Sequence, residues 1–351
     1  MSKKRVTSHD VARLAGVSRS VVSAVLNDTP GIGVSAQTRE AVLRAISELN
    51  YHVDAQARSM KTGRSMTLAA FGDTRHPLFI RLLEGMQRES EARGYHLLLC
   101  SPGGRKSGEA RNALLDLYHQ RKIDGIVTLD ETSYRSADWA ARVKEAGVPY
   151  VSVEGYSDTA GVYSVLADYR GSVKTALDYL CRDGSAAGKA PVYAEIYHAS
   201  GAKRLNWAEK NRRSAYQDWC HKHGMEPQLH RLEEQAGRVE WLDWLIELQE
   251  QSGGELPPVL VNWSSAVPDL YRAAFRLGLT IGGSLRIMAA DNTIQGDRLS
   301  VPTLSCVEIP YAAMGEEAVR CVLQQLEKQA VEPVSPGKLW LPAVLKPGES
   351  A

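Results

Sequence analysis

Four side chains near the N-terminus have the types and the spacing that recognition of base pairs requires. One face of a predicted short helix, which begins after Ser18, carries Arg19, Ser20, Ser23 and Ala24. An arginine can donate two hydrogen bonds to guanine, serines can bond to any base edge, and an alanine can contact only a thymine methyl group. The pattern indicates a helix whose first residues enter the major groove of DNA. A three-helix bundle with another use remains the alternative on this pattern alone.

Two further predicted helices would hold this helix in place. Thr7 and Asp10 have the spacing of a capping box at the start of the first helix, and Gly16 can end it in a left-handed conformation. A third helix is predicted to begin near Ser35. Two short helices joined by a glycine-containing turn form the helix-turn-helix pattern.

No pattern in the chain indicates catalysis. The segment GSAAGK at 184–189 resembles a phosphate-binding loop, but it is one residue short between its glycines and lacks a following Ser or Thr. Cys220, His221 and His223 cluster without a fourth metal ligand. We therefore expect no enzyme activity, no metal and no cofactor.

Composition separates a basic head from an acidic body. The 351 residues exceed one ordinary hydrophobic core, so two or three domains are expected. Residues 1–65 hold ten Lys/Arg and five Asp/Glu, whereas the remainder has four more acidic than basic residues. This asymmetry suits a polyanionic partner for the head. The five cysteines are scattered, and no long apolar run or signal-peptide pattern is present, so we expect a cytoplasmic protein without disulfides.

Short apolar runs alternate with amphipathic helical patterns from residue 66 onward. Strands are predicted at 67–71, 95–100, 125–129 and 148–153, with helices at 79–93, 110–120 and 136–146 between them. The pattern restarts at 169–182 and continues through strands at 192–196, 259–262 and 286–290. Such alternation predicts an α/β core of two doubly wound parallel-sheet lobes behind an all-α helix-turn-helix head. Ligands bind beside the carboxyl ends of such strands, here between the lobes.

The head resembles the lactose-repressor (LacI/GalR) family through VTSHDVARLAGVSRSVVSAVLND, VSAQTREAVLRAISELNY and AQARSMKTGRS, within residues 6–65. The resemblance implies contacts with DNA from Thr7, Ser18, Arg19, Ser20, Ser23, Ala24 and Asn27, and contacts with phosphates near Ser35, Thr38 and Tyr51. It also implies a hinge at about 54–62 that folds on DNA, with Met60 in the position of a leucine that wedges into the minor groove. Two features depart from the family pattern: Val53 replaces a usual proline, and the loop PGIGVS is longer.

The core resembles the periplasmic-binding-protein-like core of the same family, through segments such as DTRHPLF, GVPYVSVEG and VPTLSCVEIPYAAMGEEAV. The resemblance implies an effector cleft lined by His76, Phe79, Glu154, Arg212 and Asp291. Carboxylates and an arginine suit a polar ligand such as a sugar. Where the family commonly has Ala-Asn-Asp, this chain has VNWSS, so Trp263 or Ser264 stands in place of a carboxylate. Trp263 could stack on a ring or fill the cleft.

The resemblance implies a transcriptional repressor that binds near-palindromic operator DNA as a homodimer and responds to a small polar effector. We divide the chain into a DNA-binding domain at 1–53, a hinge at 54–65 and a core at 66–351, with crossings between the lobes near residues 165, 290 and 310. Two alternatives remain open: a solute-binding module with a vestigial head, and a sugar-processing enzyme with an appended head.

Overall fold

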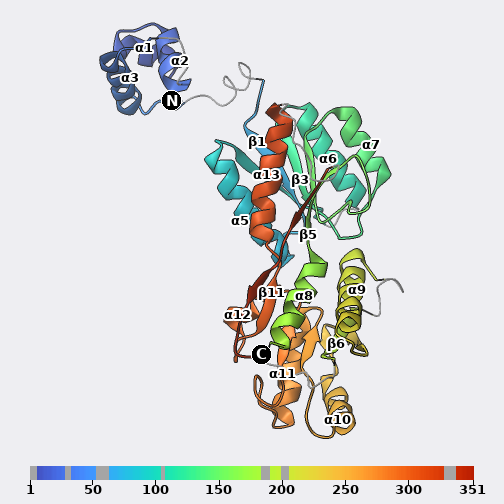
Figure 1. The fold of residues 1–351 in the computed structure, drawn as a ribbon. Coiled ribbons are helices and arrows are strands. Elements are labelled where there is room, and N and C mark those ends of the chain that lie inside the picture. The colour runs from blue at the N-terminus through green and yellow to red at the C-terminus, as the bar shows by residue number, and fades with distance from the viewer. Residues whose placement is uncertain are drawn as a thin grey trace. The chain divides into compact units, whose positions relative to one another are not determined.

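The computed structural model describes residues 6–27, 33–52, 63–103, 107–182, 190–198, 205–327 and 337–351. The chain divides into two compact units, Met1–Met66 and Thr67–Ala351 (Figure 1). Within the described ranges, no helix combines the length and the apolar character that crossing a membrane requires.

The first unit consists of three helices, α1 (Ser8–Ala15), α2 (Arg19–Asn27) and α3 (Ala36–Glu48). The predicted capping box is confirmed, because the main-chain nitrogen of Thr7 donates to Oδ2 of Asp10 at 2.9 Å and its hydroxyl donates at 2.7 Å. Gly16 ends α1 with a φ of 67°, in the left-handed region that suits glycine. Ser35 caps α3 by accepting a hydrogen bond from the main-chain nitrogen of Thr38 at 3.1 Å.

A small aliphatic core fixes the angles between these helices. Its buried members are Val11, Ala12, Val22, Val25, Val42 and Ala45. All are short or β-branched, so they lose little side-chain entropy on burial and let three short helices approach closely. The core therefore holds α2 as a rigid element of the first unit.

The second unit has two lobes, each built on one sheet. The sheet of lobe 1 is wholly parallel, with the order β12-β5-β4-β3-β1-β2. Its strands are β1 (Thr67–Phe71), β2 (His96–Cys100), β3 (Gly125–Leu129), β4 (Tyr150–Val153), β5 (Tyr163–Ala167) and β12 (Lys338–Leu341). Its helices are α5 (Pro77–Ala92), α6 (Ser107–His119), α7 (Ala137–Ala146) and α13 (Tyr311–Glu327).

Lobe 2 has a sheet of order β13-β11-β10-β9-β6-β7-β8, in which β8 and β13 are antiparallel to their neighbours. Its strands are β6 (Val192–His198), β7 (Gln228–Gln235), β8 (Arg238–Val239), β9 (Val259–Val261), β10 (Ile287–Ala289), β11 (Ser305–Glu308) and β13 (Val344–Lys346). Its helices are α8 (Tyr169–Leu180), α9 (Trp207–Lys222), α10 (Trp241–Ser252), α11 (Val267–Arg276) and α12 (Gly296–Leu299), with a 3₁₀ turn η1 (Ser264–Ala266).

The chain crosses between the lobes between β5 and α8, between β11 and α13, and between β12 and β13. The crossing expected near residue 290 is therefore wrong, because β10 and β11 are neighbours in one sheet. The third crossing lies between Leu341 and Val344 instead. It was missed because β12 pairs with β5, a partner that is distant in the sequence.

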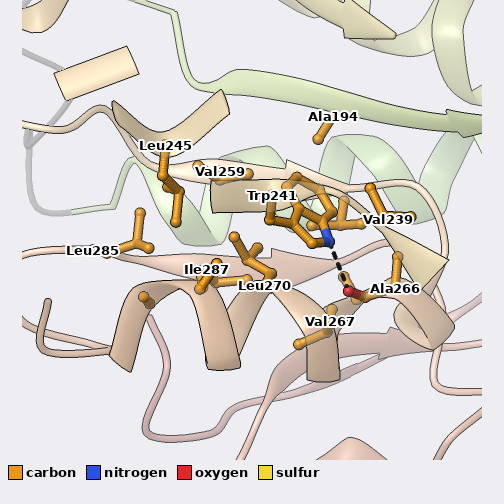
Figure 2. Packing of buried hydrophobic residues seen from close by; sticks show 14 of the residues in the cluster. Ala194, Val239, Trp241, Leu245, Val259, Ala266, Val267, Leu270, Leu285 and Ile287 are labelled. Carbon is orange, nitrogen blue, oxygen red and sulfur yellow. Dashed lines mark hydrogen bonds between the residues drawn. The ribbon is translucent and has the colours of Figure 1, made fainter. Parts of the chain in front are cut away.

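The core of lobe 2 surrounds Trp241, the first residue of α10 (Figure 2). This side chain is 1% exposed, and its indole nitrogen donates to the carbonyl oxygen of Ala266 at 3.1 Å. Val259 and Ile287 from the sheet and Leu270 from α11 belong to the same cluster. The segment WLDWLIELQEQ is thus a packed helix, as its apolar spacing predicts.

Helices α5 and α13 pack closely along lobe 1, although they are far apart in the sequence (Figure 1). A methyl group added at Gly85 would lie 1.8 Å from the carbonyl oxygen of Ala312, and one at Gly315 would lie 2.2 Å from that of Leu82. Only glycine fits at these two positions, because any Cβ would force the helices apart.

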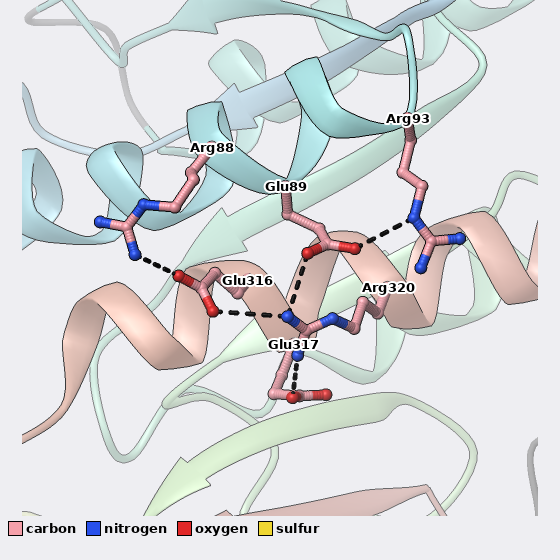
Figure 3. A network of polar contacts seen from close by, with 6 residues as sticks. All are labelled: Arg88, Glu89, Arg93, Glu316, Glu317 and Arg320. Carbon is pink, nitrogen blue, oxygen red and sulfur yellow. Dashed lines mark hydrogen bonds and ion pairs between the residues drawn. The ribbon is translucent and has the colours of Figure 1, made fainter.

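A network of ion pairs joins these two helices (Figure 3). Glu89 of α5 contacts Arg93 at 3.2 Å and Arg320 of α13 at 3.0 Å. Arg320 also pairs with Glu316 and Glu317, and Glu316 pairs with Arg88. Because Glu89 is shared by two arginines, the network ties the first helix of lobe 1 to the segment that returns from lobe 2.

We expect Gly85→Ala to lower the free energy of unfolding of the core by about 2–3 kcal/mol, since the added carbon cannot be accommodated without separating α5 from α13. Urea unfolding followed by circular dichroism would measure this loss. The control is Glu84→Ala on the exposed side of the same helix, which should change the free energy by less than about 0.5 kcal/mol. Equal stabilities of the two variants would contradict the close packing.

Candidate functional site

The N-terminal end of α2 presents a polar surface. The side chains of Ser18, Arg19 and Ser20 are exposed, and Ser23 is half-buried. The hydroxyl oxygens of Ser18 and Ser20 lie 2.6 Å apart, so the two serines form a hydrogen bond across the first turn. The opposite side of the helix is fixed by the buried valines of the head. Arg19 therefore extends from a rigid helix end into solvent.

Ala24 does not lie on this surface. Its side chain is only 4% exposed, so its expected place on the outer face of α2 is wrong. Ala24 precedes Val25, which packs into the core of the head. A buried methyl group offers almost no surface to a thymine.

The N-termini of α1 and α3 also face solvent. Thr7 and Ser35, which cap them, are exposed, whereas Thr38 and Tyr51 are half-buried. Helix N-termini favour anions, because free N–H groups and the helix dipole both point outward there. Such ends are suited to phosphate groups.

Some predicted features lie outside the described residues. These are Met60, Val53, the hinge at 54–62 and the segment 184–189; of Asn27 only the backbone is described. The longer loop is described only from Gly33 onward. Their predicted roles remain predictions.

A cleft of about 550 Å³ lies between the two lobes of the core. Four residues predicted for the effector site line it: His76, Glu154, Trp263 and Asp291. Arg212 lines a small adjoining cavity together with Trp263 and Asp291. The volume is within the range of small-molecule sites.

Phe79 is the exception among the residues predicted for the cleft. It is fully buried, and a methyl group at Gly72 would lie 2.6 Å from its ring. The ring therefore fills the space that Gly72 leaves inside lobe 1 and does not line the cleft. A helical position next to the cleft does not decide whether a side chain faces inward or outward, and here the apolar ring faces the core.

The rim of the cleft in lobe 1 is built around the start of α5. His76 caps this helix, and its Nδ1 accepts a hydrogen bond from the main-chain nitrogen of Leu78 at 3.3 Å. Burial lowers the pKa of His76, although nearby Asp73 opposes the change. Asp73 is itself paired with Arg75 through contacts of 3.0 and 2.9 Å. The rim is therefore polar and close to neutral in charge.

Glu154 forms the deepest part of the wall contributed by lobe 1. It follows β4 with a φ of 72°, a conformation that costs energy for a residue with a side chain. Its side chain is 1% exposed, and neither carboxylate oxygen has a hydrogen-bond partner among the described residues. Burial raises the pKa of Glu154 to about 7, while the hydroxyl of Tyr169, the charge of Arg212 and the hydroxyl of Tyr311 lower it in part. The two hydroxyls approach the carboxylate without reaching good hydrogen-bond geometry. The carboxyl group can thus gain or lose a proton near neutral pH.

Arg212, on α9, stabilises the wall that lobe 2 contributes to the cleft. It is fully buried, and its two terminal nitrogens donate to the carbonyl oxygens of Asn262 at 2.9 Å and Ala290 at 3.0 Å. Its guanidinium carbon lies 4.2 Å from the ring centre of Trp263 and 4.8 Å from that of Tyr169. Arg212 therefore joins the ends of β9 and β10 and contacts the rings of Trp263 and Tyr169.

Several residues that line the cleft were not predicted. Asp130 and Glu131 follow β3, and Tyr169 and Tyr311 begin the helices after two of the crossings. Asp130 pairs with buried Arg111 and accepts hydrogen bonds from Thr128 at 2.7 Å and Ser152 at 2.6 Å. The position of Asp130 at the carboxyl end of a predicted strand was a usable signal. The two tyrosines gave none, because only the crossings bring them together.

Sequence comparison assigns each part of the chain to a known type of domain. Residues 7–54 match the bacterial regulatory proteins of the lacI family. Residues 65–239 match the periplasmic binding proteins and sugar binding domain of the LacI family, and residues 193–351 match a periplasmic binding protein-like domain.

Curated relatives cover nearly the whole chain. The ribose operon repressor of Halalkalibacterium halodurans is 26% identical over 98% of both chains. The HTH-type transcriptional repressor PurR of Erwinia tasmaniensis is 25% identical over 93% of this chain and 92% of its own. Among solved structures, the lac repressor dimer bound to operator and the anti-inducer ONPF has the same fold, with a TM-score of 0.72 and 21% identity over 99% of each chain.

The head and the core thus match the two parts of one kind of regulator, in the same order along the chain. The fold agrees, since a three-helix head precedes a core of two mostly parallel sheets. The chain belongs to the LacI family and is a DNA-binding transcriptional regulator.

Proposed function

We propose that this regulator is a repressor that binds near-palindromic operator DNA as a homodimer, under the control of a small polar effector in the cleft between its lobes. The observation that carries the proposal is the exposed Arg19 at the start of a helix fixed by a buried valine core. A cytoplasmic location follows from the proposal, because the DNA of bacteria lies there.

The two N-terminal caps and the end of α2 have different tasks in this proposal. Thr7 and Ser35 hold helix N-termini against phosphate groups, which supply affinity without sequence preference. Arg19 reaches base edges, which supply specificity. Ser18, Ser20 and Ser23 add hydrogen bonds on the same face. Two heads related by two-fold symmetry would contact the two halves of the operator.

The effector acts through the angle between the lobes. Three segments of chain join the lobes, and the cleft is lined from both sides. A ligand that contacts both walls stabilises the arrangement of the lobes that fits it. This shifts the equilibrium between the arrangements of the lobes, to which the hinge would be coupled. The relatives named above are repressors, and the ribose operon repressor is named for a sugar operon. Whether the effector releases DNA or strengthens its binding depends on which arrangement the ligand favours.

Arg19→Ala should relax the base preference at one position in each half-site, with a loss of discrimination of about 1–3 kcal/mol. An operator is first selected from a random pool of duplexes. The affinities of wild-type and variant protein are then measured by fluorescence anisotropy for this operator and for a scrambled duplex. Arg44→Ala is the control, since it removes the same charge from an exposed position on α3. An equal loss on both duplexes would show that Arg19 contacts only phosphates.

Met60→Gly should weaken operator binding far more than binding to random DNA, because an apolar wedge in the minor groove bends only the operator. Met60→Leu keeps an apolar wedge and should retain the operator affinity. The ratio of the two affinities is the measurement, taken at one fixed salt concentration. If Met60→Gly leaves that ratio unchanged, the wedge is absent.

A further inference from the structure

We propose that the cleft binds a small organic cation, a ligand with at least one protonated amine, in preference to a neutral sugar. The inference rests on the proposed function, because it concerns the effector of the same cleft. It follows from the charges of the wall, from one buried carboxylate and from the position of Arg212.

The wall of the cleft carries an excess of negative charge. It is lined by Asp73, Asp130, Glu131, Glu154, Glu209 and Asp291. The adjoining cavity is lined by Arg81 and Arg212, and both of these donate to main-chain carbonyl oxygens. Asp73 and Asp130 have arginine partners. The remaining four carboxylates have no ion pair with any described residue. A cavity walled by unpaired carboxylates attracts cations, and its low-dielectric surroundings strengthen that attraction.

Glu154 points to the ligand independently of this charge. It is 1% exposed and lines the cleft, and neither oxygen has a partner in hydrogen-bond geometry among the described residues. The hydroxyls of Tyr169 and Tyr311 and the charge of Arg212 lie close enough to lower its pKa in part, but not enough to offset its burial. A buried carboxylate without partners is costly, and proteins seldom retain one unless another molecule satisfies it. A protonated amine supplies both the charge and the N–H donors that these oxygens lack.

Arg212 offers only part of its guanidinium group to the hydroxyl groups of a sugar, since its Nε is the nitrogen that lacks a hydrogen-bond partner among the described residues. Both of its terminal nitrogens are used by main-chain carbonyls, and Trp263 lies over its face. Trp263, Tyr169 and Tyr311 instead present aromatic rings to the cleft. Such rings stabilise an ammonium group near their faces. Arg212 already lies over one face of Trp263 and one of Tyr169, so a ligand would use the other faces or Tyr311.

The carboxylates favour an extended organic cation over a metal ion. Among the described residues, no three side chains of the types that ligate metals lie close enough together to hold one. Their negative charge is spread over both walls, from Asp130 in lobe 1 to Asp291 in lobe 2. A small skeleton with one or more amines can reach such separated groups.

Calorimetric titration of the full-length protein tests the proposal. The amine probes are putrescine, spermidine and glucosamine, and the neutral probes are butanediol, ribose and glucose. Putrescine differs from butanediol, and glucosamine from glucose, by exchange of hydroxyl for amine. We expect at least one amine to bind about tenfold or more tightly than its neutral counterpart, as charge-assisted hydrogen bonds to a buried carboxylate require. A neutral sugar that binds as tightly as the amines, binding of Mg²⁺ or Ca²⁺ alone, or no binding of any amine overturns the proposal.

Glu154→Gln should weaken amine binding by about tenfold or more and should leave the binding of neutral probes unchanged, since it removes charge at nearly constant volume. Glu131→Gln, on the exposed part of the wall, should weaken amine binding less and provides a second variant if the first does not fold. Glu145→Gln is the control, because it makes the same change at an exposed position of α7 that does not line the cleft. Equal amine affinities in all four proteins contradict the assignment.

The affinity for putrescine should also depend on pH. The groups that face Glu154 are Tyr169 on α8, Arg212 on α9 and Tyr311 on α13, and the alkyl amines stay protonated near neutral pH, as lysine does. Because the pKa of Glu154 is about 7, the carboxyl group must lose a proton to bind the amine below that pH. Putrescine should therefore bind about tenfold more weakly at about pH 6 than at about pH 8. Glu154→Gln should abolish the difference, and a wild-type affinity that is flat with pH contradicts the role of Glu154.

Operator binding separates this inference from the proposed function. If the protein prefers its selected operator and only neutral sugars bind the cleft, the regulator stands and the cationic ligand is wrong. If it prefers no duplex, with or without the probes, the proposed function fails whatever the cleft binds. An amine that binds and also changes operator affinity supports both.

Discussion

The three crossings of the chain between the lobes are the constraint on which the cleft depends. Two of them lead directly into Tyr169 and Tyr311, whose side chains cover Glu154 at the end of β4. The burial of this carboxylate is therefore a property of how the lobes are joined, and neither lobe produces it alone. Any rotation of one lobe against the other must move at least one of these rings. The state of the carboxylate and the angle between the lobes are thus mechanically linked.

The head and the core carry net charges of opposite sign. The basic residues concentrate in the first unit, where helix N-termini also face solvent. The core has four more acidic than basic residues, and six of its carboxylates line the cleft. A near-neutral total charge therefore conceals two opposite fields, one suited to polyphosphates and one suited to cations.

Local signals explain what could be predicted from the sequence, and long-range packing explains what could not. The capping pair Thr7 and Asp10, the end of α1 at Gly16 and most strands of the core follow from contacts within a few residues. The lining positions of His76, Glu154, Trp263 and Asp291 were found by resemblance. The burial of Ala24 was not predicted, since an apolar spacing does not say which small side chains are covered. Phe79 fills space that Gly72 leaves, and the third crossing depends on the pairing of β12 with distant β5, which no local pattern encodes.

Arg212 illustrates how a retained residue can take a different task. Its type matches the arginine that the family resemblance assigns to ligand binding, and it lies at the cleft as expected. Trp263 and Ser264 lie in the segment where the resemblance predicts a carboxylate, and the Trp263 ring covers the guanidinium group. The terminal nitrogens of Arg212 donate to the carbonyl oxygens of Asn262 and Ala290, so this arginine fixes two strand ends. On the opposite wall, neither carboxylate oxygen of Glu154 has a partner in hydrogen-bond geometry among the described residues.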